Sequence, residues 1–200
     1  MKFVITGHTH GIGKYLFTEL TNSGHLVFGV SRFSGYNLEE SIDDVTELAD
    51  VCDVFINNAA IGDCQLRLLE ALHNKVPQMI VMGSIAGDYH ELIQSEYSAN
   101  KRALATRCKE LSLVPGNKLL HLNISMLEDA VSSDNLISFK EVADVINFWI
   151  TNPKINKIDF EFKLTPYTLE KVKEKFNASQ QAIDHVVANM CELNRSAYNS

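Results

Sequence analysis

Tyr97 and Lys101 stand four residues apart in the chain. On a helix, positions i and i+4 share one face, so a phenol and an ammonium at this spacing can act on one substrate. A tyrosine phenol has an ordinary pKa of about 10 and is a poor base at neutral pH. A nearby ammonium favours the phenolate and lowers that pKa toward the range useful for proton transfer. The pair predicts an acid/base group with an electrostatic partner, although an isolated Tyr/Lys pair is more often a solvated helix face.

A glycine-rich turn near the N-terminus is the second feature with chemical meaning. The apolar run 3–5 predicts a buried strand, which leads directly into Thr6, Gly7, Gly11 and Gly13. Such glycines permit a tight turn, close approach of the backbone to a ligand and close helix–strand packing. The helix that follows directs free N–H groups toward an anion such as a pyrophosphate. An ordinary βα turn is the alternative, but the order of strand, glycines and helix favours a dinucleotide site.

Four motifs in this order resemble those of the short-chain dehydrogenase/reductase family. The turn at 6–13 is similar to the family's cofactor loop, and Asn-Asn-Ala-Ala at 57–60 is similar to its Asn-Asn-Ala-Gly motif. Ser84 closes an apolar strand where the family keeps its catalytic serine. It precedes Tyr97 by the usual spacing, and Lys101 completes Tyr-x-x-x-Lys. The chain therefore resembles a compact variant of this family.

The resemblance implies an NAD(P)-dependent oxidoreductase with Ser84, Tyr97 and Lys101 as its catalytic residues. Tyr97 would exchange a proton with a carbonyl or alcohol oxygen, and Ser84 would hydrogen-bond the same oxygen. Lys101 would lower the pKa of Tyr97 and hold the ribose beside the nicotinamide. The implied cofactor contacts come from the glycine turn, the end of the second strand, the Asn-Asn-Ala motif and the catalytic pair, namely Thr6, Gly7, His10, Gly11, Ile12, Gly13, Ser31, Arg32, Asn58, Ala59, Tyr97 and Lys101.

The end of the second predicted strand bears on the choice of cofactor. Sites that select NAD commonly place a carboxylate there for the ribose 2′-hydroxyl, whereas a basic residue accommodates a 2′-phosphate. This chain has Ser31 and Arg32 and no carboxylate. Arg32 can make bidentate contacts to phosphate, and His10 stands where NADP-preferring relatives often carry a basic residue. These residues favour NADP(H), while a solvated Arg32 would leave NAD(H) as the alternative.

Strand-like and helix-like stretches alternate along the chain. This alternation predicts an α/β fold with a doubly wound parallel sheet, the Rossmann fold, in three α/β/α layers. We expect strands at 3–5, 25–31, 37–38, 51–57, 79–82, 119–124 and 157–162. We expect helices at 14–20, 41–48, 64–74, 95–113 and 140–151, with Gly24 ending the first. Gly7, Asn57 and Ser84 fall at the carboxyl ends of strands, so the motifs should converge on one crevice.

The chain also departs from the family pattern. The interval from Asn57 to Ser84 is shorter than usual, and the family's fourth catalytic residue, an asparagine, has no counterpart there. Asn74 is an available amide but stands too close to Ser84 to take that place. The stretch between Ser125 and Phe139 leaves little room for a substrate lid. We therefore expect an open or small pocket, or one completed by another part of the molecule.

Residues 1–163 are expected to form the cofactor-binding and catalytic domain. Residues 164–200 are expected to form a helical C-terminal extension of the same domain, because their apolar positions recur at alternating spacings of four and three. This extension would either dock on its own domain or contact another subunit. The second alternative predicts a homo-oligomer assembled through the C-terminal helices.

Composition limits the classes of partner. The 200 residues are 46% hydrophobic and carry a net charge of −7, which argues against a nucleic-acid surface. No apolar run is long enough to span a membrane, and the predicted first strand leaves no room for a signal peptide. The four scattered cysteines fit a reducing cytoplasm better than a disulfide framework or a metal site. A small carbonyl or alcohol substrate is the expected partner.

Two other functions share these motifs. A dinucleotide-binding regulatory or scaffolding protein could keep the site without meaningful turnover, and the missing asparagine supports that alternative. The intact Ser84, Tyr97 and Lys101 oppose it. Sugar-nucleotide epimerases and dehydratases also use Tyr-x-x-x-Lys. However, the glycines of their cofactor turn usually have a different spacing, and these enzymes usually have a longer C-terminal substrate domain. The oxidoreductase therefore remains the favoured prediction.

Overall fold

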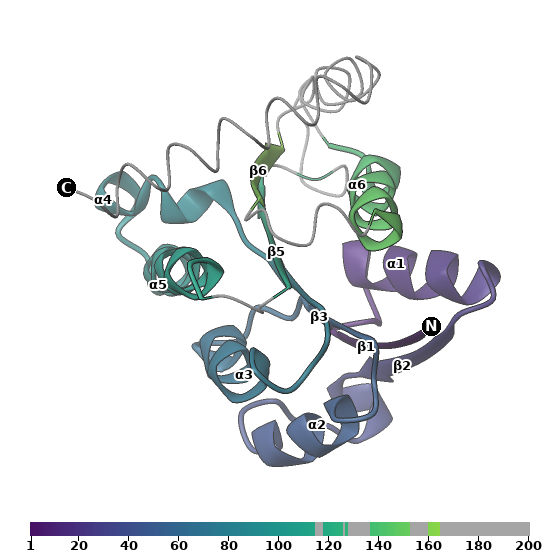
Figure 1. The fold of residues 1–200 in the computed structure, drawn as a ribbon. Coiled ribbons are helices and arrows are strands. Elements are labelled where there is room, and N and C mark those ends of the chain that lie inside the picture. The colour runs from purple at the N-terminus through teal and green to yellow at the C-terminus, as the bar shows by residue number, and fades with distance from the viewer. Residues whose placement is uncertain (115–117, 126, 128–136, 153–159, 165–200) are drawn as a thin grey trace, which may run out of the picture. The chain divides into compact units, whose positions relative to one another are not determined.

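Six parallel strands form one sheet in the computed structural model, which describes residues 1–114, 118–125, 127, 137–152 and 160–164. Across the sheet the order is β2-β1-β3-β4-β5-β6 (Figure 1). The strands are β1 (Lys2–Thr6), β2 (Leu26–Val30), β3 (Val54–Asn57), β4 (Met79–Met82), β5 (Leu119–Ile124) and β6 (Phe160–Leu164). The chain starts at β1, moves outward to β2 and returns to β3 on the other side of β1. This reversal makes the sheet doubly wound, which confirms the predicted Rossmann fold.

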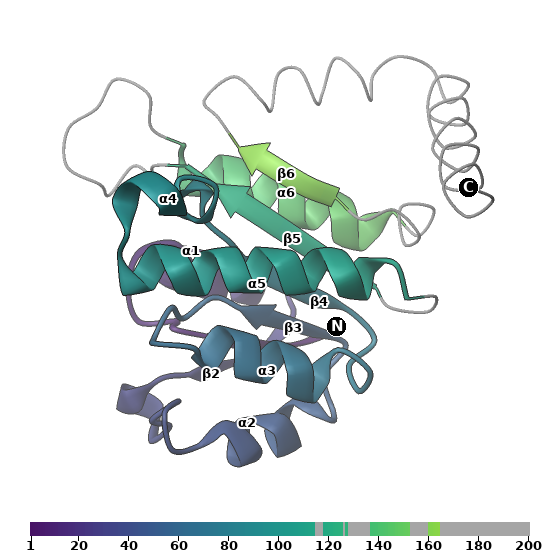
Figure 2. The same cartoon turned by 90° about the vertical axis from the view of Figure 1, so that its left-hand side faces the viewer.

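Helices cover both faces of the sheet and make the three layers (Figures 1 and 2). On one face lie α1 (Gly11–Asn22) and α6 (Phe139–Thr151), which contact each other. On the other face lie α2 (Ile42–Ala49), α3 (Cys64–Leu72) and α5 (Glu96–Ser112), packed in that order. A short helix, α4 (His90–Ile93), and two 3-10 turns, η1 (Arg32–Ser34) and η2 (Ile85–Gly87), complete the described elements.

The central strands are buried along their whole length because helices cover them on both sides. This explains their continuous apolar sequences. The ends of the helices follow from local signals. Ser95 and Ser138 each form a capping box at the start of α5 and α6, and Gly24 follows the C-cap of α1 with a left-handed φ of +81°. These caps fix where each helix begins and ends relative to the sheet.

The predicted short strand at Asn37 and Leu38 is wrong. Its segment is a turn, because the carbonyl of Asn37 accepts hydrogen bonds from the N–H groups of Glu40 and Ser41 at 2.9 and 2.8 Å. Gly35, with φ of +90°, directs the chain away from the sheet after η1. Leu38 is buried, but it packs into the core beside α2 instead of pairing with β2.

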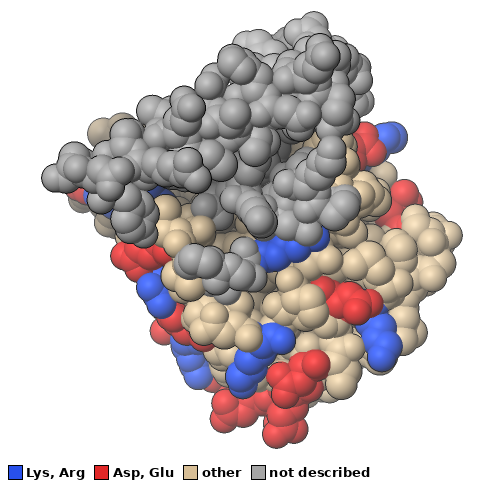
Figure 3. Space-filling view, viewed as in Figure 1, with Lys and Arg blue, Asp and Glu red and all other residues tan. Residues whose placement is uncertain are grey.

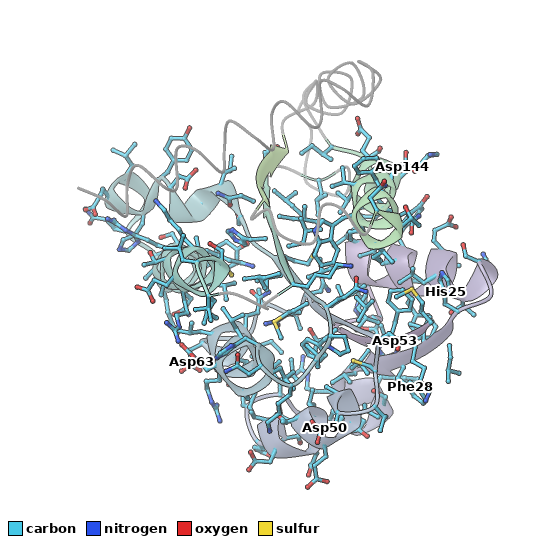
Figure 4. All side chains as sticks on the ribbon, viewed as in Figure 1. His25, Phe28, Asp50, Asp53, Asp63 and Asp144 are labelled. Carbon is cyan, nitrogen blue, oxygen red and sulfur yellow. The ribbon has the colours of Figure 1, made fainter. Side chains whose placement is uncertain are left out.

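As a result β2 is an edge strand, with β1 as its sole strand neighbour among the described residues. Two of its large apolar side chains, Leu26 and Phe28, are exposed, and Figure 4 labels Phe28 at this edge of the sheet. The face seen in Figure 3 carries acidic and basic side chains side by side, with acidic ones gathered at the edge that α2 forms. The acidic residues of α2 include Asp43 and Asp44, which lie in its first turn.

The chain divides into two compact units, Met1–Thr165 and Pro166–Ser200. All the described residues belong to the first unit, so the predicted helical extension at 164–200, apart from the last residue of β6, lies outside them. Most of the stretch between Ser125 and Phe139, where we expect little room for a substrate lid, also lies outside the described residues. Within the described part of the chain, no helix combines the length and the apolarity needed to cross a membrane.

Candidate active site

The carboxyl ends of β1 and β3 are tied together by the side chains of Thr6 and Asn58. The Thr6 hydroxyl accepts hydrogen bonds from the backbone N–H groups of Asn58 and Ala59, each at 2.9 Å. The Asn58 amide donates to the carbonyl of Thr6 at 2.9 Å and to that of Gly7 at 3.4 Å. Four of the residues implied as cofactor contacts, Thr6, Gly7, Asn58 and Ala59, therefore form one network.

The glycine turn has the geometry that its sequence predicts. Gly7 and Gly11 adopt left-handed φ angles of +72° and +51°, which side-chain-bearing residues rarely adopt. A Cβ atom on Gly13 would stand 2.1 Å from the Gly7 carbonyl oxygen, so only glycine allows α1 to start this close to the turn. Ile12 is buried beside it and anchors the first turn of the helix in the core.

A pocket of about 760 Å³ opens beside this turn. Among its lining residues are five of the implied cofactor contacts: Gly7, His10, Ser31, Arg32 and Ala59. The lining also contains Lys14 and His8, and the described residues contribute no Asp or Glu to it. The pocket therefore offers basic groups and the start of α1 to an anionic ligand.

Two histidines of the turn have defined neighbours. The ring of His8 packs against Phe17 with centroids 5.0 Å apart, and it occupies the space where a side chain at Gly29 would lie. His10 is the N-cap residue of α1, and its Nδ1 is 2.8 Å from the Thr9 hydroxyl. Both histidines line the pocket: His10 is exposed, whereas His8 is half-buried between α1 and β2.

Tyr97 and Lys101 lie on one face of α5, as their spacing predicts. Tyr97 is 48% exposed, so a ligand can reach its ring, whereas Lys101 is only 5% exposed. The Lys101 Nζ is 5.5 Å from the centroid of the Tyr97 ring, within the range of a cation–π contact. The structure therefore brings together the two residues that the sequence pairs.

The Lys101 ammonium is held by neutral acceptors. Its Nζ donates to the Gln65 side-chain oxygen and to the Met82 carbonyl, both at 2.7 Å. Burial lowers the pKa of Lys101 from its ordinary value of 10.5 to about 8, because the charged form loses hydration. The ammonium therefore loses its proton at a lower pH than that of an exposed lysine.

Ser84 lies at the end of β4 and caps η2, where its hydroxyl accepts from the Ala86 N–H at 3.2 Å. The same turn packs tightly on α5: a Cβ on Gly87 would be 3.0 Å from the carbonyl carbon of Lys101. The structure thus places the Ser84 turn against the helix that carries Tyr97 and Lys101. Within the described part of the chain, the Ser84 hydroxyl makes no hydrogen bond to either of them.

Sequence reasoning missed two site residues. Gln65, in the first turn of α3, contacts the ammonium directly, although its sequence neighbourhood contains no recognisable motif. Lys14 lines the pocket one residue after Gly13, and its place in the first turn of α1 was a signal that could have identified it. Over the described ranges of the chain, no cluster of three or more His, Cys, Asp or Glu side chains could hold a metal ion.

No protein-family model matches the sequence, and no curated protein matches it. Solved structures match the fold. A UDP-glucuronic acid 4-epimerase from Bacillus cereus, in complex with NAD, has a TM-score of 0.66 at 15% identity, covering 90% of this chain and 84% of that one. A 3-alpha-hydroxysteroid dehydrogenase from a Pseudomonas species, complexed with NADH, has a TM-score of 0.61 at 17% identity, covering 86% and 99%.

A short-chain dehydrogenase from Burkholderia cenocepacia, in complex with NADP, has a TM-score of 0.62 at 15% identity, covering 91% of this chain and 94% of that one. The chain therefore has the fold of short-chain dehydrogenase/reductase structures, which confirms the fold that the four motifs imply. At these identities the likeness extends to the fold alone.

Replacing Thr6 by valine tests the link between β1 and β3. Valine keeps the shape but removes the acceptor of two backbone N–H groups, so the free energy of unfolding should fall by about 1–3 kcal/mol. Thr6→Ser keeps the hydroxyl and serves as the matched control, with an expected loss below about 1 kcal/mol. Urea denaturation of both variants measures the difference. Equal stability of the valine and serine variants would contradict the proposed link.

Proposed function

We propose that this protein is an oxidoreductase that transfers a hydride between NADP(H) and a carbonyl or alcohol substrate. Tyr97 is the general acid/base, Ser84 binds the reacting oxygen, and Lys101 stabilises the charge beside them. The observation that carries the proposal is the placement of an exposed phenol and a buried ammonium on one face of α5, with Nζ 5.5 Å from the Tyr97 ring centroid.

The glycine turn and its pocket fit a dinucleotide. Because Gly13 has no side chain, the start of α1 packs closely on the Gly7 carbonyl, the close helix–strand packing that a dinucleotide turn uses to direct backbone N–H groups at a pyrophosphate. Lys14, His10 and Arg32 supply positive or hydrogen-bonding groups along the same pocket. These residues would hold the cofactor. The solved structures of the same fold include chains in complex with NAD, NADH and NADP, which supports a nicotinamide dinucleotide in general.

A nicotinamide bound there would donate or accept the hydride. In the direction of reduction, Tyr97 gives its phenolic proton to the oxygen that gains negative charge, and in oxidation it takes the proton from the alcohol. Ser84 donates a hydrogen bond to the same oxygen and orients it. Lys101, charged below its pKa of about 8, favours the phenolate through its positive field.

The lysine contacts also favour a second candidate, a dinucleotide-binding protein without meaningful turnover. Among the described residues, the Lys101 ammonium donates to the Gln65 side chain and the Met82 carbonyl and not to the Tyr97 oxygen. A lysine held in this way could serve only to bind the ribose. Turnover of any substrate would separate the two functions.

Tyr97→Phe tests the acid/base role. The variant keeps the ring but loses the proton, so turnover should fall by about 100- to 10,000-fold while cofactor affinity stays nearly unchanged. A panel of carbonyl substrates followed by NADPH absorbance measures turnover, and fluorescence titration measures binding. Tyr15→Phe, which makes the same change on α1, is the matched control and should retain full turnover. Undiminished turnover in the Tyr97 variant would rule out the assignment.

Arg32→Ala tests the cofactor preference. A charge-assisted contact to a 2′-phosphate is worth about 1.5–3 kcal/mol, so NADPH affinity should fall by roughly 10- to 100-fold. The affinity for NADH, which has no 2′-phosphate, should change little. Arg67→Ala removes an exposed arginine from α3 and is the control. Tighter binding of NADH than of NADPH by the unmodified protein, unaffected by Arg32→Ala, would overturn the preference.

A further inference from the structure

Gln65 is a buried polar side chain that none of the sequence motifs includes. It is 4% exposed and stands in the first turn of α3, beside the carboxyl ends of β3 and β4. It exchanges two hydrogen bonds with Asn57. The side-chain amide of Asn57 donates to the backbone carbonyl of Gln65, and the side-chain amide of Gln65 donates to the backbone carbonyl of Asn57, each at 2.8 Å. The start of α3 is thereby fixed to the end of β3.

The orientation of the Gln65 amide follows from its neighbours. Its nitrogen faces two carbonyl oxygens, those of Asn57 at 2.8 Å and Met82 at 3.2 Å, which can only accept. Its oxygen must then point the other way, toward the Lys101 ammonium at 2.7 Å, which can only donate. A reversed amide would oppose donor to donor and acceptor to acceptor. The direction of the contact is therefore determined by the surrounding chemistry.

The groups around the ammonium explain why this contact matters. From α3 it meets the neutral Gln65 amide, and from β4 the neutral Met82 carbonyl. On its own helix the ammonium faces the Tyr97 ring. Cys108 of the same helix also acts on Lys101 electrostatically, in the direction that raises the pKa of the lysine. Among the described residues, no carboxylate forms an ion pair with Lys101. Its charge is thus stabilised mainly by these two neutral acceptors.

We infer that Gln65 is a positioning residue for the proposed reaction, which acts by holding the Lys101 ammonium in place at the end of β4. An ammonium has three N–H donors, and the two acceptors from α3 and β4 occupy two of them. The third remains for the cofactor ribose or for the Tyr97 oxygen. Gln65 also keeps the lysine charged where burial opposes the charge. The short segment between Asn57 and Ser84 thereby supplies a side-chain amide to the site.

The inference rests on the proposed function, but its contact can be tested without turnover. NMR titration of protein with isotope-labelled lysine reports the pKa of Lys101 directly, with Lys101→Met used to assign its signal. In Gln65→Glu a carboxylate faces the ammonium, so the pKa of Lys101 should rise by about one pH unit or more. In Gln65→Met the acceptor is lost, so the pKa should fall below its value in the unmodified protein.

Asn74→Asp is the matched control, because it makes the same amide-to-carboxylate change at an exposed position just beyond the other end of α3. It should leave the pKa of Lys101 unchanged. An unchanged pKa in folded Gln65→Glu and Gln65→Met would overturn the inference, whatever the activity. The two pKa shifts, together with a turnover profile whose basic limb moves with them, would support it. Pronounced shifts in a protein that turns over no substrate would contradict the proposed reaction and leave the contact established.

Discussion

A buried ammonium at the carboxyl edge of the sheet is the constraint on which the site depends. Removing a charge from water is unfavourable unless hydrogen-bond acceptors replace the lost hydration. Lys101 finds them in the side chain of Gln65 and the carbonyl of Met82, which come from two different elements. The charge therefore stays in place only if α3, β4 and α5 meet in one arrangement. The fold and the chemistry of the site share this requirement.

The same carboxyl edge is also organised by hydrogen bonds that the Thr6 hydroxyl accepts and the Asn58 amide donates. These bonds join β1 to β3 at the reversal of the strand order, where ligands of such sheets bind. The glycine turn lies beside this link, and the packing of Gly13 on the Gly7 carbonyl sets the start of α1. The pocket beside the glycine turn thus offers basic side chains and the start of α1 to the phosphates of the proposed dinucleotide. Tyr97 and Lys101 lie on α5, and the turn that carries Ser84 packs against that helix.

Spacing and pattern predicted much of this arrangement. The i, i+4 spacing placed Tyr97 and Lys101 on one helix face, and the order of strand, glycines and helix predicted the turn at 6–13. Both follow from local geometry, which a sequence states directly. The strand proposed at 37–38 failed because turn hydrogen bonds to Asn37 outweighed the apolar character of Leu38. So short an apolar run does not distinguish a strand from a turn that buries one side chain.

The contact between Gln65 and Lys101 lay beyond sequence reasoning for a different reason. The two residues are 36 positions apart, and they meet only because α3 and α5 pack side by side. Nothing in the sequence near Gln65 marks its amide as different from that of Asn74, which ends up exposed. The roles of Ser84, Tyr97 and Lys101 remain predictions, which the geometry supports by placing their segments against one another.

A crystal structure with bound NADP(H) tests the central claim most directly. Our account predicts a pyrophosphate at the start of α1, the ribose beside the Lys101 ammonium and the Tyr97 oxygen facing the nicotinamide ring. A Tyr97 oxygen turned away from that ring would contradict it. So would a glycine turn that stays empty at saturating dinucleotide.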